Sequence, residues 1–497
     1  MKCDVLFINP GDQRRTYQSL DEEFTAIAPP AWAALLAGRV RGNGHTVALY
    51  DVNVEGWPRD GASAVLGGYD PQLIVLMVYG HQPSASTQTM PAASRIARDI
   101  KAFNKEIPLA MGGTHPSALP ERTLKEEAVD FVIQGEGAHA LDGLIRYLKG
   151  KGGIGDMPGV WYKEAGEARQ AAAPARLRNL DGELGEYAWD LLPGLDRYRA
   201  HNMHCFQDFE RSRRDDFSDV RSPYAVVYTS LGCPYFCHYC CIHAVYGKPS
   251  IRYWSVERVV SWIDTLVQRH GVRNIRFDDE LFILDPKRVE RFCDMLIERS
   301  YDLNLWAYGR VDTVDDRLLR KLKAAGVNWV CLGIESANAR VREDVNKRIR
   351  RDIGEVVRKI QSQGMYVLGN YMFGLPEDSL ETMEETLASA MELKCEFVNF
   401  YTVMAYPGSQ LYERFSDREG VLPESWAGFS QHGYETKPLP TRYVSAQEVL
   451  RFRDEAFHRY FTNPTYLDMM KVKFGRKILA HLEKMLAVKI RRRILEQ

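Results

Sequence analysis

The stretch LGCPYFCHYCC (231–241) places four of the chain's nine cysteines in one short loop. Cys233, Cys237 and Cys240 have the spacing C-x3-C-x2-C, with Tyr239 directly before the last of them. Thiolates on a tight loop are good ligands for iron–sulfur clusters. Three such ligands on a four-iron cluster leave one iron with an open site, which a substrate or cofactor can occupy.

Cys241 is expected not to bind this metal, because its Cβ cannot easily point the same way as that of the adjacent Cys240. Two other interpretations of the loop remain open. A zinc site needs four protein ligands, which Cys241 or His238 would complete, although C-x-x-C pairs for zinc usually stand further apart. The other interpretation is a cysteine-rich turn that binds no metal.

The sequence around and after this loop predicts a parallel α/β unit. Amphipathic helices such as Val256–His270, Lys287–Arg299 and Asp315–Ala325 alternate with short apolar runs. These runs cover residues 224–232, 274–280, 303–310, 329–336, 366–374 and 397–408. Six βα units in a row predict a partial or complete parallel barrel, whose chemistry belongs at the carboxyl ends of its strands. The cysteine loop follows the first strand, where an active site is expected.

An earlier α/β series precedes this unit. Its apolar runs cover residues 5–10, 45–53, 73–80, 107–113 and 130–137, with helices expected at Ala31–Arg41 and Pro91–Phe103. Such runs are typical of buried parallel strands and predict an open, doubly wound sheet with a ligand crevice at the carboxyl ends of its strands. Glycines at those ends let the backbone approach a large flat or phosphorylated ligand. No G-x-G-x-x-G follows the first strand, so a dinucleotide is not expected.

These patterns divide the chain into α/β domains at 1–150 and 221–415, a linker over 151–220 and a mainly helical region over 416–497. Within the linker, GKGGIGDMPG and ARQAAAPARL are typical of loops, and YAWDLLPGLDRY of a short helical connector. A length of 497 residues agrees with two or three domains.

Composition and charge exclude several classes of protein. The formal net charge of −1 gives no general attraction to nucleic acid. The N-terminal stretch MKCDVLFINPGDQRR turns polar after one short apolar run, unlike a secretory signal. No stretch reaches the roughly 18–20 apolar residues of a membrane span. We therefore expect a cytoplasmic protein, in which clustered cysteines more often hold metal or do redox work than form disulfides.

The C-terminal stretch 471–497 is expected to be helical and carries nine Lys or Arg against two Glu. Its apolar residues at helical spacing are Ile478, Leu479, Leu482, Leu486 and Ile490. A basic amphipathic helix can lie on an anionic membrane surface, so peripheral membrane contact is one hypothesis. We favour the alternative, in which the helix packs its apolar stripe on the barrel.

At the cysteine loop the sequence resembles the radical S-adenosylmethionine (SAM) superfamily, whose hallmark is C-x3-C-x2-C after the first strand of a partial barrel. FDDELF (277–282), LGIES (332–336), GNYMFGLPEDS (369–379) and AYPGS (405–409) are similar to its motifs on later strands. The resemblance implies a partial (β/α)6 barrel, SAM as a cofactor, and a 4Fe–4S cluster on Cys233, Cys237 and Cys240. The residues implied to contact SAM are Tyr239, Asp279, Glu280, Arg310, Glu335, Ser336 and Pro407. For Glu335 the alternative is a structural strand-end acid, and for Arg310 a structural ion pair.

The first half resembles the Rossmann-like cobalamin-binding domain that precedes the radical SAM core in one large subclass, on GGTHPSALPE (112–121) and VDFVIQGEG (129–137). The residues implied to contact cobalamin are Tyr79, His81, Ser84, Ser86, Gly112, Gly113, His115, Ser117, Gly135, Glu136 and Gly137. After the first strand, GDQRRTYQ (11–18) lacks the histidine of the cobalamin motif D-x-H-x-x-G. We therefore expect no protein histidine on cobalt, with His81 and His115 as loop residues.

A cobalamin domain joined to a radical SAM domain implies a methyltransferase that acts at an unactivated centre. In that family a 5′-deoxyadenosyl radical made from SAM takes hydrogen from the substrate. The substrate radical then takes a methyl group from methylcobalamin, which a second SAM restores. The stretches 23–38, 252–260 and 303–319 resemble the group that includes the anaerobic magnesium-protoporphyrin cyclase. A cyclase or other oxidoreductase without net methyl transfer is thus the alternative, and the intact motifs disfavour a non-catalytic sensor.

The resemblance also implies partners, namely a small-molecule or lipid substrate and an electron donor such as flavodoxin or ferredoxin. Aromatic and amide side chains at strand ends are candidates for the substrate pocket, with core packing as the alternative for the aromatic ones. They are Trp306, Tyr308, Asn370, Tyr371, Asn399 and Tyr401. The sequence assigns no catalytic residue and does not identify the substrate.

Overall fold

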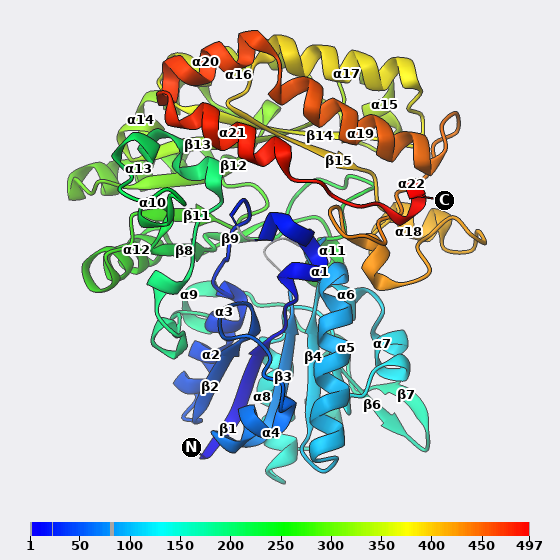
Figure 1. Ribbon diagram of the computed structural model, residues 1–497. Coiled ribbons are helices and arrows are strands. Elements are labelled where there is room, and N and C mark those ends of the chain that lie inside the picture. Colours follow the sequence, from blue (N-terminus) through cyan, green and yellow to red (C-terminus); the bar gives the residue numbers. More distant parts are fainter. Residues whose placement is uncertain (1, 22, 80–83, 497) are drawn as a thin grey trace.

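The computed structural model describes residues 2–21, 23–79 and 84–496, which form two α/β halves stacked end to end (Figure 1). The strands of the first half point their carboxyl ends toward the second half, and α1 (Gln13–Tyr17) lies between the two. The predicted order of two α/β units followed by a helical region is confirmed.

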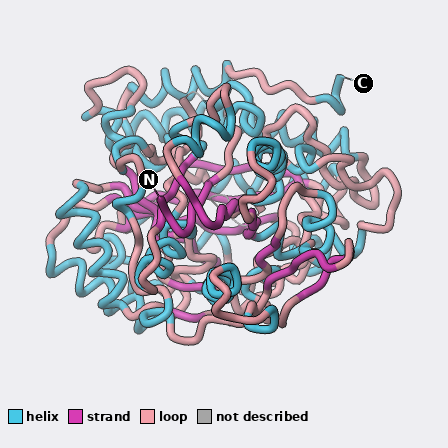
Figure 2. The backbone as a smooth tube through the Cα atoms, turned by 90° about the horizontal axis from the view of Figure 1, so that it is seen from below, coloured by secondary structure: helices cyan, strands magenta, loops and turns pink. Residues whose placement is uncertain are grey.

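The first half is built on a seven-stranded sheet in the order β2-β1-β3-β4-β5-β6-β7. The first five strands are parallel: β1 (Lys2–Asn9), β2 (Val47–Asp51), β3 (Asp70–Val78), β4 (Leu109–Gly113) and β5 (Phe131–Ile133). Alternate residues of a strand face opposite sides. Accordingly, Val5 and Phe7 pack with α2 (Ala31–Gly42) and α8 (Ala138–Leu148), and Leu6 and Ile8 pack with α4 (Gly61–Gly67) and α5 (Ala85–Phe103). The sheet is therefore doubly wound, with its strands enclosed by helices (Figure 2).

The linker prediction for 151–220 is wrong over one segment. β6 (Val160–Glu164) and β7 (Glu167–Gln170) form an antiparallel hairpin that extends the first sheet beyond β5. Its two-residue turn, Ala165 and Gly166, has positive φ at both positions, which is the geometry that matches the twist of a hairpin. Asn-Gly and Asp-Gly are the usual residues there, so Ala-Gly was a weak signal. The predicted helical connector is present as two 3-10 turns, Trp189–Leu191 and Leu195–Arg197.

The second half is an open parallel sheet of six strands in the order β15-β14-β13-β12-β11-β8, which confirms the partial barrel. The strands are β8 (Tyr224–Val227), β11 (Asn274–Phe277), β12 (Asn304–Arg310), β13 (Val327–Glu335), β14 (Tyr366–Phe373) and β15 (Phe397–Thr402). The connecting helices include α12 (Val256–His270), α13 (Pro286–Arg299), α14 (Leu319–Ala324), α16 (Ile353–Ser362) and α17 (Leu380–Leu393). Local signals define their ends. Asp285 caps α13 by accepting from the backbone of Lys287 and Arg288, and Pro286 takes the first helical position.

The C-terminal region covers the barrel with α19 (Ala446–Phe461), α20 (Pro464–Phe474) and α21 (Lys477–Ala487), and the chain ends in α22 (Arg493–Glu496), which contacts α19 (Figure 1). The single helix expected over 471–497 is thus interrupted, because Gly475 adopts φ +81 after α20. Ile478 and Leu482 are fully buried in the core. The favoured alternative, a helix that packs its apolar stripe on the barrel, agrees with this arrangement.

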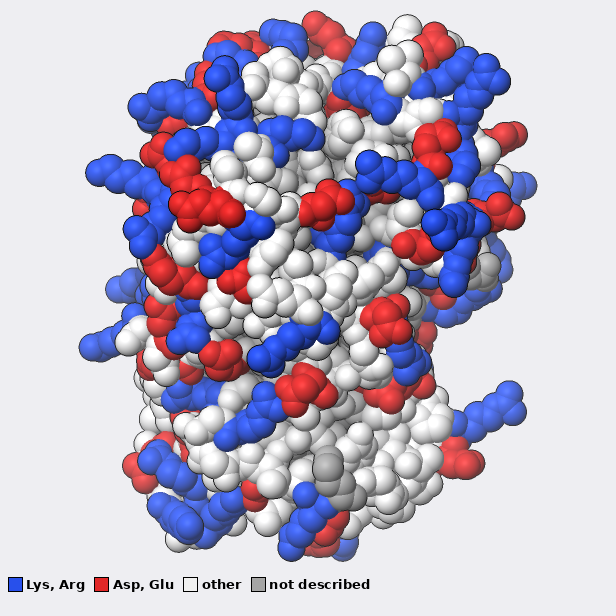
Figure 3. Space-filling view, turned by 90° about the vertical axis from the view of Figure 1, so that its left-hand side faces the viewer, with Lys and Arg blue, Asp and Glu red and all other residues white. Residues whose placement is uncertain are grey.

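Shorter elements complete the chain. The helices are α3 (Val52–Glu55), α6 (Thr114–Ala118), α7 (Pro120–Glu126), α9 (Leu180–Glu183), α10 (Ser218–Arg221), α11 (His243–Tyr246), α15 (Ala339–Asp344) and α18 (Gln410–Phe415), and the strands β9 (Ser230–Leu231) and β10 (Arg252–Tyr253) form a small ribbon. On the face in Figure 3, basic and acidic side chains are intermixed. Across residues 2–21, 23–79 and 84–496, no helix is long and apolar enough to cross a membrane.

Candidate active site

Three cavities meet where the carboxyl ends of the two sheets face each other. The interdomain cavity lies at the ends of β1 and β3, the cysteine-loop cavity beside Cys240, and the barrel cavity inside the six-stranded sheet. Tyr228 and Asp278 line both of the first two. Tyr17, Ala26 and Gln88 line both the interdomain and the barrel cavities. The cysteine-loop and barrel cavities share the side chains of Ser84, Tyr308, Asn370, Tyr401, Tyr406 and Gln431.

The cysteine loop follows β8 and β9, as predicted, and its backbone is held from three sides. His238 donates its N–H to the Val345 carbonyl (3.0 Å) and accepts at its own carbonyl from the backbone of Leu411 (3.0 Å). The carbonyl of Cys233 accepts from the Ser250 N–H (3.1 Å). These bonds anchor the backbone of the loop to three other segments of the chain.

The four sulfurs of the loop differ in their surroundings. Cys233, Cys237 and Cys240 are partly exposed, whereas Cys241 is buried at 3% exposure. Burial, with smaller contributions from Glu280 and Cys237, raises the pKa of Cys233 to about 11. Cys237 also contributes to the raised pKa of Cys240, after burial and Glu280, so the three thiols lie near one another.

The thiols of Cys233, Cys237 and Cys240 are the type of ligand that an iron–sulfur cluster needs. The three thiols share one loop and Cys240 lines a cavity, as a cluster with an open site for a ligand requires. Among the described residues, no three Cys, His, Asp or Glu side chains are gathered into positions that coordinate a metal ion. The thiols are thus near one another without being in coordinating geometry.

Beside the cysteine loop, Glu335 is the centre of a buried polar cluster. Its Oε1 accepts from the hydroxyl of Tyr239 (2.9 Å) and from Nζ of Lys347 (2.7 Å). Both side chains of the Glu335–Lys347 pair are less than one-tenth exposed. Glu335 ends β13 with φ +65, a left-handed conformation that costs energy for a residue other than glycine. Tyr239 and Glu335, two of the predicted SAM contacts, both line the cysteine-loop cavity, and their contact with SAM stays a prediction.

Two adjacent acids after β11 lie in different settings. Asp279 accepts from the backbone and hydroxyl of Thr229 and from the hydroxyl of Ser230, so its carboxylate already ties two strand ends together. Glu280 lines the cysteine-loop cavity, and no hydrogen bond to its carboxyl is found among the described residues. Burial, with smaller contributions from Asp278 and Asp279, raises the pKa of Glu280 to about 8.

Three other predicted SAM contacts do not line the cavities. Arg310 pairs with Asp312 and lies over the ring of Tyr235 in the cysteine loop, which is the structural ion pair considered as the alternative. Ser336 is fully buried and hydrogen-bonded to Thr386 (3.1 Å). Pro407 is buried in a loop whose next residue, Gly408, packs so tightly that a Cβ there would lie 2.7 Å from that of Ala244. Contact with SAM stays a prediction for all three.

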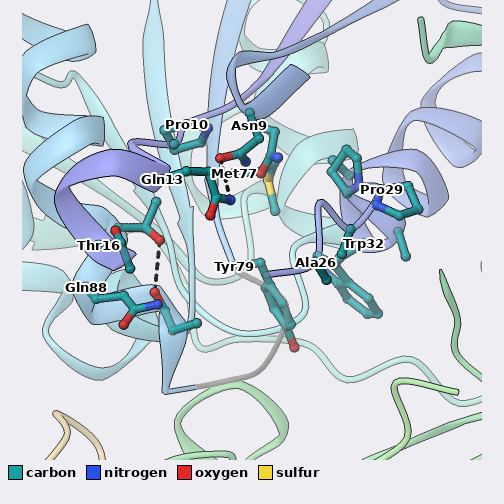
Figure 4. Close-up of a pocket in the computed structure, with 18 of the residues that line it drawn as sticks. Asn9, Pro10, Gln13, Thr16, Ala26, Pro29, Trp32, Met77, Tyr79 and Gln88 are labelled. Carbon is teal, nitrogen blue, oxygen red and sulfur yellow. Dashed lines mark hydrogen bonds between the residues drawn. The ribbon is translucent and has the colours of Figure 1, made fainter. Parts of the chain in front are cut away.

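The interdomain cavity is formed at the point where β1 and β3 send their chains to opposite faces of the sheet, the usual ligand position in such a fold. Figure 4 shows Asn9, Pro10 and Gln13 on one side, Thr16 and Gln88 on another, and Trp32 beside Tyr79. Trp32 and Tyr79 are stacked at 5.4 Å between ring centroids. The buried Oε1 of Gln13 has no hydrogen-bond partner. A ligand with amide groups, as cobalamin has, fits this unpaired acceptor.

Among the predicted cobalamin contacts that the structure describes, only Tyr79 lines this cavity, and Ser84 lines the two cavities next to it. Tyr79 is held by its hydroxyl against that of Tyr246 (2.7 Å). None of the described residues that line the interdomain cavity is a histidine, and His81 lies outside the described residues. The absence of a protein histidine on cobalt stays a prediction.

The GGTHP loop lies beyond the cavity and has its own packing reasons. Gly113 has φ +142, and only glycine fits there because a Cβ would lie 2.0 Å from the Val78 carbonyl oxygen. Gly112 packs on Ile133. His115 is buried against Trp426, and burial lowers its pKa to about 3, so the ring is neutral. Ser86 bonds the Val78 carbonyl and accepts from the His115 N–H (2.9 Å).

The next loop is also internally bonded. Ser117 accepts from the Gly135 N–H (2.9 Å), and Gly135 and Gly137 both have positive φ. Glu136 forms a buried ion pair with Arg252 and accepts from the Leu177 N–H (2.8 Å), so it joins the two halves of the chain. Contact with cobalamin stays a prediction for these residues, whose polar groups already have partners.

The barrel cavity contains five of the six residues predicted to face a substrate: Trp306, Tyr308, Asn370, Asn399 and Tyr401. The placement of Tyr371 in the substrate pocket is wrong, and the alternative of core packing holds for it. Its neighbours Asn370 and Met372 face inward, and alternate residues of a strand face opposite sides. Tyr371 instead packs on Phe400 in the core. The sequence missed the other walls, which come from α1, the connector and the C-terminal region (Tyr17, His201, Gln431, His432 and Arg453).

Comparison with known proteins adds two family matches. Residues 19–145 match the B12 binding domain, and residues 227–390 match the radical SAM superfamily. An uncharacterized methyltransferase of Pyrococcus horikoshii is 27% identical over 441 residues, which are 88% of this chain and 89% of that protein. The anaerobic magnesium-protoporphyrin IX monomethyl ester cyclase of Rubrivivax gelatinosus is 24% identical over 475 residues, 93% of this chain and 78% of that protein.

A solved structure shares the fold over the whole length. It is the radical S-adenosylmethionine methyltransferase TsrM from Kitasatospora setae, with cobalamin and a 4Fe–4S cluster bound. The TM-score is 0.67 at 15% identity, and the match covers 98% of this chain and 100% of that chain.

Proposed function

Because the chain joins a B12 binding domain to a radical SAM domain and so belongs to the cobalamin-dependent radical SAM enzymes, we propose that it is a methyltransferase. It moves a methyl group from SAM, through cobalamin, to an unactivated centre of a small substrate. Its cofactors are a 4Fe–4S cluster, SAM and cobalamin.

The observation that carries this proposal is the meeting of three cavities at shared side chains. Tyr228 and Asp278 stand between the interdomain and cysteine-loop cavities, and Tyr17 and Gln88 between the interdomain and barrel cavities. A reaction among three bound molecules requires that they be held close together and away from water. When bound, the cluster supplies the electron that cleaves SAM, and cobalamin carries the methyl group.

We assign the three cavities by their side chains. The thiols of Cys233, Cys237 and Cys240 hold the cluster. Tyr239, Glu280 and Glu335 would orient SAM in the cysteine-loop cavity, where the ammonium group of SAM would lower the raised pKa of the Glu280 carboxyl. The stacked Trp32 and Tyr79 would help to hold cobalamin in the interdomain cavity. The substrate occupies the barrel cavity.

The names of the relatives support the transfer of a methyl group. The Pyrococcus horikoshii relative is called a methyltransferase and matches nearly all of its length, and a hopanoid C-3 methylase of Methylococcus capsulatus matches 76% of its length at 25% identity. The Rubrivivax gelatinosus relative is called a cyclase. The alternative, a radical oxidoreductase without net methyl transfer, is therefore kept as an outcome of the test.

We further propose that a small acidic electron carrier, such as flavodoxin or ferredoxin, docks beside the cysteine loop. Phe236 in the middle of the loop is 39% exposed, and its carbonyl accepts from Nδ2 of Asn346 (2.7 Å). Arg348 and Arg350 follow that asparagine, are exposed, and form no ion pair with any described residue. An apolar side chain beside unpaired positive charge suits an acidic partner.

The docking proposal is tested by comparing two reductants. Arg348→Glu with Arg350→Glu should lower flavodoxin-driven SAM cleavage by about tenfold through charge reversal. Cleavage driven by dithionite, which needs no docking, should be unchanged. Arg358→Glu, an exposed arginine of α16, is the matched control. Equal losses with both reductants would show damage to the cluster site instead. Work with such a carrier also fits our expectation of a cytoplasmic protein.

The proposed reaction is tested by its products. Reduced holoprotein is incubated without oxygen with methyl-labelled SAM and a small-molecule extract of its own cells. We expect a labelled product together with 5′-deoxyadenosine and S-adenosylhomocysteine. A new product without label, formed with 5′-deoxyadenosine alone, would overturn methyl transfer and favour a cyclase.

A further inference from the structure

The barrel cavity has an unusual balance of charge. Arg276 and Arg453 line it, together with His201 and His432, but no Asp or Glu does so among the described residues. Arg276 is paired with Asp278 at 2.6 Å, and both side chains are buried. Arg453 therefore determines the net charge of the wall.

Arg453 shares its carboxylate with a second buried arginine. Its Nη1 donates to Asp454 Oδ1 (2.7 Å), and Arg492 approaches the same carboxylate at 3.2 Å. The two guanidinium side chains are 8% and 2% exposed, so two buried positive charges face one negative charge. Although burial alone would raise it, Arg453 and Arg492 hold the pKa of Asp454 below its usual value.

The histidine beside this cluster adds no charge. Burial, and then Arg453 and Arg492, hold the pKa of His432 well below its usual value, so its ring is neutral. Arg453, Arg492 and Asp454 together thus carry a net charge of about +1, with both guanidinium groups buried and the carboxylate 30% exposed. A buried cation without a full partner is costly, and a bound anion removes that cost.

Much of the remaining lining is aromatic, and the guanidinium of Arg276 lies 5.4 Å from the centre of the Trp306 ring. Trp306 and Tyr308 are stacked with their ring centroids 5.7 Å apart, and Phe397, Tyr401 and Phe457 complete the lining. The cavity is also lined by Asn399, which donates to Asn370 (3.0 Å), and Asn370 in turn donates to Cys331. Flat aromatic rings bind well against such a surface, because offset and edge-on contacts add to the burial of apolar area.

We propose that the barrel cavity binds a planar aromatic substrate that carries one anionic group, with the ring against Trp306 and Tyr308 and the anion at Arg453. This rests on the proposed function only for the assignment of the barrel cavity to the substrate. SAM and cobalamin do not explain the charge, because Arg453 lines neither the cysteine-loop cavity nor the interdomain cavity. The proposal disfavours an apolar lipid, which would leave Arg453 without a partner.

The test is a matched set of ligands and calorimetric titration of the reconstituted holoprotein. Indole-3-propionate has both features, its amide lacks the charge, and 3-cyclohexylpropionate lacks the aromatic ring. Phenyl phosphate distinguishes a phosphate from a carboxylate as the preferred anion. We expect indole-3-propionate to bind about tenfold or more tightly than its amide, because a charge-assisted hydrogen bond is replaced by a neutral one. We expect it also to bind more tightly than the saturated acid.

Arg453→Gln should remove the preference for the acid over the amide. Arg459→Gln is the matched control, because this arginine lies on the same helix, is exposed and pairs only with Glu384 among the described residues. Trp306→Leu should weaken the acid and the amide alike. If Arg453→Gln does not fold, the affinities of the four ligands for the native protein test the proposal by themselves.

The proposal is overturned if the amide or the saturated acid binds the native protein as tightly as indole-3-propionate, or if none of the compounds binds at millimolar concentration. The same holoprotein is assayed for methylation of its cobalamin by SAM, which needs no substrate. Loss of ligand preference with that reaction intact would refute the substrate class and leave the proposed function standing.

Discussion

Cys241 differs from the other three cysteines of its loop, although it is adjacent to one of them. It is buried at 3% exposure, although its residue borders the cysteine-loop cavity beside Cys240, whereas Cys233, Cys237 and Cys240 stay partly exposed. Consecutive residues in an extended loop point in different directions, so the sequence alone indicated which sulfur to set apart. The spacing of the four cysteines thus predicts three cluster ligands and one cysteine, Cys241, that is not a ligand.

This division is tested by two alanine variants. Cys237→Ala should abolish the brown colour of the reconstituted protein and all SAM cleavage, because a cluster ligand is lost. Cys241→Ala should retain the full iron content of a 4Fe–4S cluster. Iron and sulfide analysis after anaerobic reconstitution measures both. An iron-free Cys241→Ala protein would show that the ligands are assigned wrongly.

Asp51 gives the stability of the first half a dependence on pH. Its carboxylate is fully buried and accepts from Asn9 (2.8 Å), Tyr198 (2.9 Å) and the Asn53 N–H (3.0 Å). Burial raises the pKa of Asp51 to about 6. Between its usual pKa and this value, the folded state holds a proton that the unfolded chain has lost. Stability contributed by this group is therefore present below that window and lost as pH rises through it.

Asp51→Asn should remove this dependence. Between pH 4 and pH 7 the free energy of unfolding of the native protein should fall by up to about 3 kcal/mol relative to the variant. Urea titrations at several pH values measure the difference, with exposed Asp70→Asn as the control. A constant difference between native protein and Asp51→Asn across the range would contradict the raised pKa.

At the scale of elements, the parallel strands were predictable and the hairpin was not. Buried strands such as β3 (Asp70–Val78) and β12 (Asn304–Arg310) have apolar runs that few other structures explain. In β6 and β7 the edge position leaves one face exposed, so Trp161 and Tyr162 stand among charged residues and the pattern is weak. Edge strands are defined by the neighbour they pair with, which a single sequence does not show.

The predicted cobalamin loop illustrates the same limit. Gly113 has a structural reason to be glycine, namely the close approach of the Val78 carbonyl, and its contact with cobalamin stays a prediction. The interdomain cavity is lined by Gln13, Trp32 and Gln88, which the sequence did not single out because their segments meet only after folding. The one available signal was the position of GDQRRTYQ after the first strand, at the place where a doubly wound sheet binds its ligand.

The C-terminal helices should not bind membranes. Ile478 and Leu482 of α21 are fully buried, so the apolar stripe that a bilayer would receive is already used in packing. At physiological ionic strength, the full-length protein should remain in the supernatant after sedimentation with anionic liposomes, as it does with neutral ones. Sedimentation with anionic liposomes alone would contradict this packing and support the membrane hypothesis.

At the scale of the whole molecule, the active site exists only where the two halves meet. The buried ion pair of Glu136 with Arg252 joins the halves at one point, and the C-terminal region adds Gln431 and Arg453 to the cavities. The sequence predicted the two halves and much of the barrel wall, because strand ends converge by topology. It did not predict the contributions of the connector and the C-terminal region, which depend on how the units pack.

The lower face of cobalt is expected to lack a nitrogen ligand. No histidine is among the described residues that line the interdomain cavity, and the hydroxyl of Tyr79 is held by Tyr246. Without a strong lower ligand, cobalt is easier to reduce to the state that accepts a methyl group. Electron paramagnetic resonance of the cob(II)alamin form should show no nitrogen superhyperfine splitting. Such splitting would place a nitrogen ligand, from the protein or the benzimidazole tail, on cobalt.

Methylation of the bound cobalamin tests the proposed function most directly, because it needs no knowledge of the substrate. Holoprotein with its cobalt reduced to the nucleophilic state is mixed once, without oxygen, with SAM labelled in its methyl group. Labelled methylcobalamin and S-adenosylhomocysteine should form in equal amounts, since the interdomain and cysteine-loop cavities adjoin at Tyr228 and Asp278. A reduced holoprotein that cleaves SAM to 5′-deoxyadenosine but leaves its cobalamin unmethylated would contradict the assignment as a methyltransferase.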